Sequence, residues 1–308
     1  MKEGHFQILN RCPLKLSSLS MRTRGVIMEK KPDITFSIVV TALNPGKKLV
    51  KTVESILMQQ YNQIEIIVKD GMSADGSIDE LADKYGEDRR IRIFREPDSS
   101  IYNGMNQAIL KCTGEYILFL NCGDTFCQPD ILSRTADVIR KDRIGSNHLT
   151  IYYGNTHSGQ TNTVIYAPPV ISGFTCYRNI PCHQSCFYDS RLFTERQSTE
   201  FFREEYRIRA DYEHFLWSYY RKSAKMVYLD MTVAEYEGGG YSESRENRRR
   251  DKEEHQMITR ELMGKWERRA YQLVMILTLA PLRRWIANNK ALSGAYEKLK
   301  SIVYRRKG

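Results

Sequence analysis

Short runs of β-branched and aromatic residues alternate with helix-forming segments through the first half of the 308-residue chain. Four such runs are predicted strands, at 36–42, 64–68, 91–94 and 116–120. Helices are predicted after them, at 50–57, 77–85, 100–111 and 129–140. Strands that alternate with helices form βαβ units, so we predict an α/β protein with a mainly parallel sheet flanked by helices.

The second half of the chain has a less regular pattern. Shorter strands are predicted at 149–153, 163–166, 185–188 and 225–233. A helix is predicted at 210–220, and the chain is helical and basic from 245 onward. Motifs are therefore easier to place in the first half than in the second.

Acidic residues follow two of the predicted strands. Asp70 comes directly after the second strand, and Asp124 follows the fourth. In parallel sheets ligands bind at the carboxyl ends of strands. The sequence contains neither G-x-G-x-x-G after the first strand nor G-x-x-x-x-G-K-[ST], which disfavours a dinucleotide-binding fold and excludes a P-loop enzyme. A carboxylate that holds Mg²⁺ against a phosphate group is an alternative device for binding phosphate.

The net charge of +10 is concentrated at the two ends of the chain. Residues 245–308 hold 17 Lys and Arg against 7 Asp and Glu, and residues 1–31 hold 7 against 2. Basic ends suit an anionic membrane or nucleic-acid surface, and they equally suit a well-solvated helical tail. Seven scattered cysteines argue against a disulfide framework and favour a reducing compartment.

Four ordered motifs resemble those of one enzyme family. They are TALN at 41–44, VKDGMSADGS at 68–77, EPDSSIYNGMN at 96–106 and FLNCGD at 119–124. The chain resembles the family 2 glycosyltransferases of bacterial polysaccharide biosynthesis over residues 36–242. The resemblance implies a GT-A fold and an inverting, Mg²⁺- or Mn²⁺-dependent transfer from a nucleotide sugar.

The resemblance also implies donor-binding roles. Asp70 matches the position that binds the nucleotide base, where a carboxylate can accept the imide N–H of uracil. Asp98 precedes a predicted helix, so it either binds ribose or the donor sugar or merely caps that helix. The remaining donor-side residues are Thr41, Asn44, Asn121, His183 and Gln184. For His183 and Gln184, a role on the acceptor side or a structural role is an alternative.

Asp124 matches the last acid of the family's metal motif. Typical members have two adjacent acids there, whereas this chain has Gly123 before Asp124. The departure leaves one carboxylate as a direct metal ligand. We therefore expect an ion held mostly by the donor diphosphate and water.

Asp211, at the start of the predicted helix 210–220, matches the position of the catalytic base. Inverting transfer needs a carboxylate that takes the proton of the acceptor hydroxyl. Glu213 is the rival base, two residues further on and so on another helix face. A helix N-terminus also favours acids for purely structural reasons.

The C-terminal segment combines apolar residues with Arg and Trp, as in Trp266, 271–282 and 283–285. This pattern suits a helix that lies in a membrane interface, and it also suits a helix packed on the catalytic domain. We expect a nucleotide-sugar donor, a glycan or lipid-linked acceptor and no nucleic acid. The expected location is the cytoplasm or the inner face of the cytoplasmic membrane.

The expected domains are an N-terminal extension at 1–33, a GT-A domain at 34–242 and a basic helical tail at 243–308. Within the GT-A domain, 34–145 is the nucleotide-sugar half and 146–242 the acceptor half. Met28 is an alternative start of translation. The rival functions are a sugar nucleotidyltransferase, for which the segment 44–48 is a poor phosphate loop, and a non-catalytic membrane- or nucleic-acid-binding protein.

Overall fold

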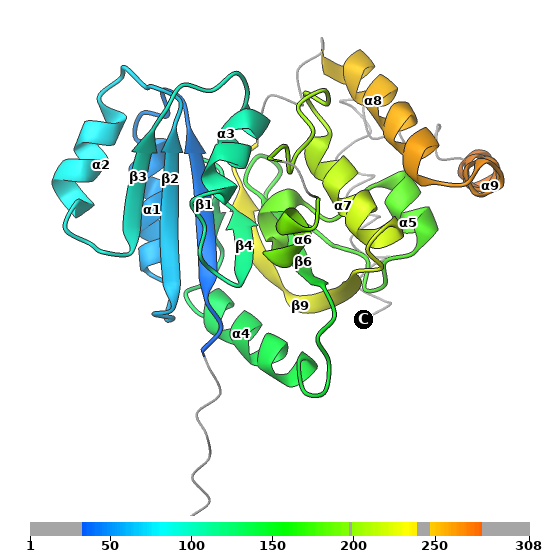
Figure 1. Ribbon diagram of the computed structural model, residues 1–308, viewed down its shortest axis with the longest axis horizontal. Coiled ribbons are helices and arrows are strands. Elements are labelled where there is room, and N and C mark those ends of the chain that lie inside the picture. Colours follow the sequence, from blue (N-terminus) through cyan, green and yellow to red (C-terminus); the bar gives the residue numbers. More distant parts are fainter. Residues whose placement is uncertain (1–32, 197–198, 239–246, 279–308) are drawn as a thin grey trace, which may run out of the picture. The chain divides into compact units, whose positions relative to one another are not determined.

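The computed structural model describes residues 33–196, 199–238 and 247–278 (Figure 1). The first half of the fold contains β1 (Phe36–Ala42), α1 (Lys48–Leu57), β2 (Ile64–Asp70), α2 (Ser77–Tyr85), β3 (Ile91–Arg95), α3 (Ile101–Ile109), β4 (Tyr116–Phe119), β5 (Thr125–Phe126) and α4 (Ile131–Asp142). The second half contains β6 (Thr150–Ser158), β7 (Thr163–Ile165), α5 (Gly173–Arg178), η1 (His183–Ser185), β8 (Cys186–Asp189), α6 (Arg191–Thr194), α7 (Ala210–Tyr220), β9 (Lys225–Tyr236), α8 (Asn247–Leu262) and α9 (Lys265–Leu277).

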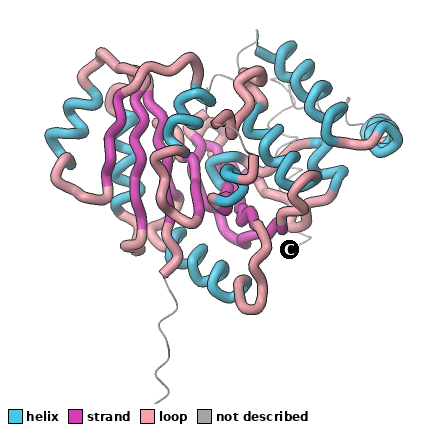
Figure 2. Tube along the Cα trace, viewed as in Figure 1, coloured by secondary structure: helices cyan, strands magenta, loops and turns pink. Residues whose placement is uncertain are grey.

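The strands form one sheet in the order β3-β2-β1-β4-β8-β6-β9-β5, with β7 paired to β6 (Figure 2). The strands β3, β2, β1 and β4 pair in parallel. Strand β8 enters antiparallel to β4, and β6 pairs in parallel with β9. The predicted α/β class is confirmed. The strand order reverses beside β1, and in open α/β sheets such a reversal marks the ligand-binding edge.

The parallel strands are buried on both faces because helices cover each side of the sheet. Ile38 and Val40 of β1 pack in the core that contains α1, α2 and α4. Val39, which points to the opposite face, packs in the core that contains α3 and α7. Full burial of each such side chain stabilises the fold by about 1.5–3 kcal/mol. The continuous apolar runs in the sequence are explained by this two-sided burial.

Helix α8 packs on the α/β core instead of standing apart from it. Ile258 and Leu262 are buried in the same core as α7. Helix α9 follows with no buried residue. Within the described residues, no helix is long and apolar enough to cross a bilayer. Residues 1–32 of the predicted N-terminal extension and residues 243–246 and 279–308 of the predicted basic tail lie outside the described residues.

Candidate active site

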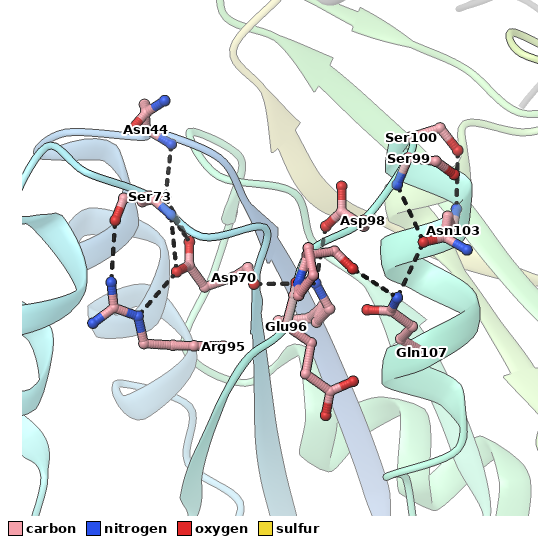
Figure 3. A network of polar contacts seen from close by, with 12 residues as sticks. Asn44, Asp70, Ser73, Arg95, Glu96, Asp98, Ser99, Ser100, Asn103 and Gln107 are labelled. Carbon is pink, nitrogen blue, oxygen red and sulfur yellow. Dashed lines mark hydrogen bonds and ion pairs between the residues drawn. The ribbon is translucent and has the colours of Figure 1, made fainter.

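The turn after β2 is organised around Asp70, the last residue of that strand. Its side chain is fully buried, and its oxygens accept hydrogen bonds from the backbone N–H (3.1 Å) and the hydroxyl of Ser73. Arg95 ends the neighbouring strand β3 opposite Asp70, and its Nε lies 3.3 Å from Asp70 Oδ2 (Figure 3). The carboxylate is therefore enclosed by its own turn and by Arg95.

Asp98, in the loop between β3 and α3, is held by a buried lysine. Lys69 Nζ lies 2.9 Å from Asp98 Oδ2, and the Lys69 side chain is only 1% exposed. The same ammonium donates to the backbone carbonyls of Asp70 and Glu96. A Cβ on Gly71 would come within 2.7 Å of Asp98 Oδ2, so a side chain there would displace the Asp98 carboxylate. Lys69 thus ties the loop after β3 to the end of β2, a role that its sequence position did not reveal.

The loops after β1, β2 and β4 meet at one edge of the sheet. Thr41 Oγ1 at the end of β1 donates to Asn121 Oδ1 after β4, at 3.0 Å. The Asn44 backbone N–H donates to Ser73 Oγ at 2.8 Å, and Asn44 Oδ1 accepts from the Ala74 N–H at 2.9 Å. The structure therefore brings the predicted donor-side residues of these three loops together, as expected for neighbouring carboxyl ends of parallel strands.

Asp124 lies between β4 and β5 and is 3% exposed. Gln184 Nε2 donates to its Oδ2 and the Glu237 backbone N–H to its Oδ1, each at 3.0 Å. Burial raises the pKa of the Asp124 carboxyl to about 6; the two hydrogen bonds oppose the rise, and the Glu237 carboxylate adds to it. The structure thus places two predicted site residues, Asp124 and Gln184, in direct contact.

His183 is buried among the aromatic side chains of Phe119, Tyr188 and Phe202. Its ring stacks on Phe119 with a centroid separation of 4.8 Å, and Nδ1 lies 3.3 Å from the Tyr188 hydroxyl. Burial lowers the pKa of His183, opposed by the charge of Asp211, so the imidazole is neutral at pH 7. Its Nε2 is buried and has no hydrogen-bond partner within the described part of the chain. A buried polar atom without a partner is a natural contact point for a ligand.

Cys182 links the two halves of the predicted site. Burial raises the pKa of its thiol, and the charges of Asp211 and Asp124 both add to that rise. Both carboxylates are therefore within electrostatic reach of one residue, although 87 positions separate them in the sequence.

Asp211 is oriented from two sides. The Tyr102 hydroxyl of α3 lies 2.9 Å from Asp211 Oδ1 and 2.7 Å from the Ile208 carbonyl oxygen. The buried Glu254 carboxylate of α8 accepts the backbone N–H groups of residues 207–209 at 2.9–3.0 Å. Helix α8 therefore fixes the segment that leads into α7. Neither Tyr102 nor Glu254 was predicted, because each acts on a segment far away in the sequence.

Glu213, the rival base, has a different environment. Its side chain is 1% exposed, and Arg196 lies 2.7 Å from its Oε2. Burial raises the pKa of Glu213, while the positive charge of Arg196 lowers it. Removal of one partner of a buried ion pair leaves the other charge uncompensated and destabilises the fold by about 3–5 kcal/mol. The geometry therefore gives Glu213 a structural ion pair and favours Asp211 as the base.

The residues around Asp124 fit a divalent ion only if the donor helps to bind it. The described residues contain no group of three or more His, Cys, Asp or Glu side chains that could hold a metal ion. An ionised carboxylate has about four lone-pair sites, so the two hydrogen bonds to Asp124 leave room for a cation. Magnesium is bound by one or two carboxylates together with substrate phosphates. The donor set at Asp124 matches this sparse type of site.

The sheet and the polar residues at its carboxyl edge define an α/β protein of the GT-A type. A family model described as glycosyl transferase family 2 matches residues 37–225. This match covers more than half of the chain, so the protein belongs to the family 2 glycosyltransferases. The family suggested by the four sequence motifs is thereby confirmed.

Curated relatives act in glycan biosynthesis according to their names. The PGL/p-HBAD biosynthesis glycosyltransferase of Mycobacterium tuberculosis is 29% identical over 211 residues, which cover 67% of this chain and 78% of that protein. The chondroitin synthase of Escherichia coli is 29% identical over 185 residues, which cover 58% of this chain and 26% of that protein. The match thus covers most of the first relative and about a quarter of the second.

Solved structures share the fold. A fragment of S. aureus TarS in complex with UDP has a TM-score of 0.57 at 17% identity, and the match covers 67% of this chain and 61% of that chain. The mannosyltransferase PcManGT from Pyrobaculum calidifontis, in complex with GDP-Man and Mn²⁺, has a TM-score of 0.56 at 12% identity, with 87% of each chain covered. The chain spans about three fifths of the TarS fragment that it matches.

The base-binding role of Asp70 stays a prediction, and the structure sharpens its test. We expect Asp70→Asn to lower the affinity for UDP about tenfold. The one acceptor oxygen of asparagine would serve the Ser73 donors, and its amide nitrogen cannot accept the imide N–H. The melting temperature should change little, since asparagine keeps one acceptor for the Ser73 donors. Calorimetric titration with UDP and a melting curve measure the two effects. Equal UDP affinity in variant and parent would show that Asp70 only shapes the turn.

Proposed function

We propose that this protein is an inverting glycosyltransferase that acts in cell-surface polysaccharide biosynthesis. It transfers a hexose or N-acetylhexosamine from a nucleoside diphosphate sugar, taken here as a UDP-sugar, to a glycan or lipid-linked acceptor. The observation that carries the proposal is that the loops after β1, β2 and β4 meet at one edge of the sheet, where Gln184 from the second half of the chain donates to Asp124. Asp124 is assigned to the leaving diphosphate, and Asp211 is assigned to the acceptor.

The donor occupies the edge formed by the loops after β1, β2 and β4. Asp70 is assigned to the base, Asp98 in the loop after β3 is assigned to the ribose or donor sugar, and Thr41, Asn44 and Asn121 complete this edge. Their mutual hydrogen bonds hold these loops in place before the donor arrives, and this preorganisation lowers the cost of binding. Residues 34–145 form the nucleotide-sugar half in this proposal, and 146–242 form the acceptor half.

The diphosphate end of the donor lies at Asp124, beside Gln184 and His183. A Mg²⁺ or Mn²⁺ ion held by Asp124 would neutralise the negative charge of the departing diphosphate. The neutral His183 ring offers its unpartnered Nε2 to a polar group of donor or acceptor. Gln184 already donates to Asp124 and so keeps that carboxylate in one orientation.

Asp211 is assigned as the general base that takes the proton of the acceptor hydroxyl. Its Oδ1 faces the Tyr102 hydroxyl, which leaves Oδ2 as the oxygen that can receive the proton. As the hydroxyl attacks the anomeric carbon from the face opposite the diphosphate, a carboxylate on the acceptor side is needed there. In this proposal Asp124 serves the leaving diphosphate and Asp211 serves the acceptor hydroxyl.

A donor panel tests this function. The protein is incubated with UDP- and GDP-sugars in Mn²⁺ buffer, and nucleoside diphosphate release is measured with and without an extract of bacterial glycolipids. We expect release from one UDP-hexose or UDP-N-acetylhexosamine, stimulated by the extract. No release from any donor under these conditions would argue against the proposed transfer.

The exposed face of α9 supports a location at the inner face of the cytoplasmic membrane. Trp266, Ala270, Leu273, Val274 and Leu277 recur at helical spacing, and all five are exposed. The adjoining face of α9 contacts the protein through Glu267 and Tyr271. An apolar stripe on a helix whose surroundings are basic suits an anionic lipid surface.

Acidic residues on this stripe should abolish lipid binding. We expect the protein to sediment with vesicles that contain anionic phospholipid, and Trp266→Glu with Leu273→Glu to reduce the bound fraction at least about tenfold. The matched control is Leu110→Glu with Ile144→Glu, since these apolar residues are also exposed but lie outside α9. Equal binding of both double variants would contradict a lipid role for α9.

A further inference from the structure

Gly123 occupies the position where related enzymes have the first of two adjacent acids, and in this protein another side chain fills the space. Its φ of +104° is in the left-handed region, which favours glycine. A Cβ added to Gly123 would overlap Glu237 Oε2 and would contact the Lys48 stem at 3.5 Å. The volume that a side chain at position 123 would enter is therefore taken by the Glu237 carboxylate.

Sheet register explains why Glu237 reaches this place. Strands β5 and β9 pair antiparallel, with Thr125 opposite Glu235 and Phe126 opposite Ala234. Continued by two residues, the same register puts residue 237 opposite residue 123. The hydrogen bond from the Glu237 N–H to Asp124 Oδ1 shows that the two segments stay in contact beyond the ladder. The position of Glu237 is thus fixed by backbone pairing.

Lys48 balances the Glu237 charge in the ligand-free protein. Its Nζ lies 2.6 Å from Glu237 Oε2, and both side chains remain partly exposed, at 55% and 38%. Lys48 is the first residue of α1, the helix that follows β1. An exposed ion pair of this kind contributes little to stability, typically about 0–1 kcal/mol. The Lys48–Glu237 ion pair can therefore be broken at a small cost in free energy, and each side chain can then bind another charged group.

We propose that Glu237 is the second carboxylate of the metal site, in place of the acid missing at position 123, and that Lys48 moves from Glu237 to the donor diphosphate when the metal binds. The inference rests on the proposed function, because it assigns a metal and a diphosphate to the Asp124 site. It raises the expected number of carboxylates that bind the metal directly from one to two. Two carboxylates are within the ligand set that Mg²⁺ takes together with substrate phosphates, which is one or two carboxylates.

Mn²⁺ binding, followed by electron paramagnetic resonance of the free ion in the presence of saturating UDP, tests the role of Glu237. Because even indirect partners of a metal ligand contribute about 10–100-fold to metal affinity, we expect Glu237→Gln to weaken Mn²⁺ binding at least about tenfold. The matched control is Glu54→Gln. Glu54 pairs with Lys84 at the same 2.6 Å with similar exposure, 51% for Lys84 and 39% for Glu54, and lies outside the site. Glu54→Gln should keep the parental affinity.

Lys48→Met tests the exchange of partners in the same assay. Without UDP, this variant should bind Mn²⁺ more tightly than the parent, because Glu237 no longer has a competing cation. Its affinity for UDP in the presence of Mn²⁺ should fall about tenfold, since a charged contact to phosphate is lost. Lys84→Met, the control, should change neither value. Weaker Mn²⁺ binding by Lys48→Met without UDP would overturn the exchange.

The outcomes separate this inference from the proposed function. If the parent binds Mn²⁺ with UDP and Glu237→Gln binds it within twofold, the assignment of Glu237 is wrong while the metal site at Asp124 stands. If the parent binds no Mn²⁺ even with UDP, the metal mechanism and the role of Glu237 fall together. Melting curves of all four variants check that a lost affinity does not reflect unfolding.

Discussion

Asp124→Ala is expected to abolish sugar transfer. Asp124 is the proposed metal ligand in the loop after β4, and without its carboxylate the departing diphosphate would lose the proposed link through the ion to the protein. Removal of a metal or an equivalent electrostatic stabiliser costs at least about 10²–10³-fold in rate. Nucleoside diphosphate release with the cognate donor measures the effect. We expect the rate to fall to the level of a protein-free blank.

The fold of this variant needs a control, because Asp124 is buried and accepts hydrogen bonds from Gln184 and Glu237. Each buried donor left without a partner costs about 1–3 kcal/mol. Asp124→Asn keeps the volume and one of the two acceptors, so it should melt closer to the parent than Asp124→Ala and still be inactive. EDTA should likewise stop transfer by the parent. Unchanged turnover in EDTA would exclude the metal mechanism.

Asp211→Asn is expected to reduce transfer to the acceptor by about 10²–10⁴-fold, the usual contribution of general base catalysis. Asparagine keeps the size of the side chain and can still accept the Tyr102 hydrogen bond, but it cannot take a proton. Donor binding should survive because none of the residues assigned to the donor lies on α7. Single-turnover transfer and UDP calorimetry on the same preparation measure the two properties.

Glu213→Gln is the matched comparison for Asp211→Asn. It removes a buried charge that pairs with Arg196, so its main effect should be a lower melting temperature. Near-normal transfer by Asp211→Asn, together with inactive but folded Glu213→Gln, would assign the base to Glu213. Normal transfer by both variants would mean that neither residue takes the acceptor proton.

Local pattern was sufficient to predict the first half of the fold. The runs around Val39 and Ile67 are apolar at consecutive positions because both faces of those strands are covered by helices. Asp70 and Asp124 could be placed at the edge of the sheet because a strand end is visible in the sequence as the end of such a run. Fold class and strand-end acids thus follow from information within about ten residues.

The parts that could not be predicted depend on contacts between distant segments. Glu237 and Lys48 are 189 residues apart, and they meet because the two-residue strand β5 pairs with the end of β9. A strand of two residues has no hydrophobic period that sequence analysis could detect. Glu254 likewise acts on the start of α7 from a helix that composition alone describes as a solvated basic tail. Such roles become visible only when the register and the packing are known.

The most direct test of the central claim is mass spectrometry of the products. The full-length protein is incubated with Mn²⁺, a panel of UDP- and GDP-sugars and bacterial glycolipid extract. We expect an acceptor mass increased by one hexose or N-acetylhexosamine, with release of nucleoside diphosphate and no product from Asp124→Ala. A product that instead gains a nucleoside monophosphate would indicate a nucleotidyltransferase. Unchanged donor and acceptor across the whole panel would contradict the glycosyltransferase assignment.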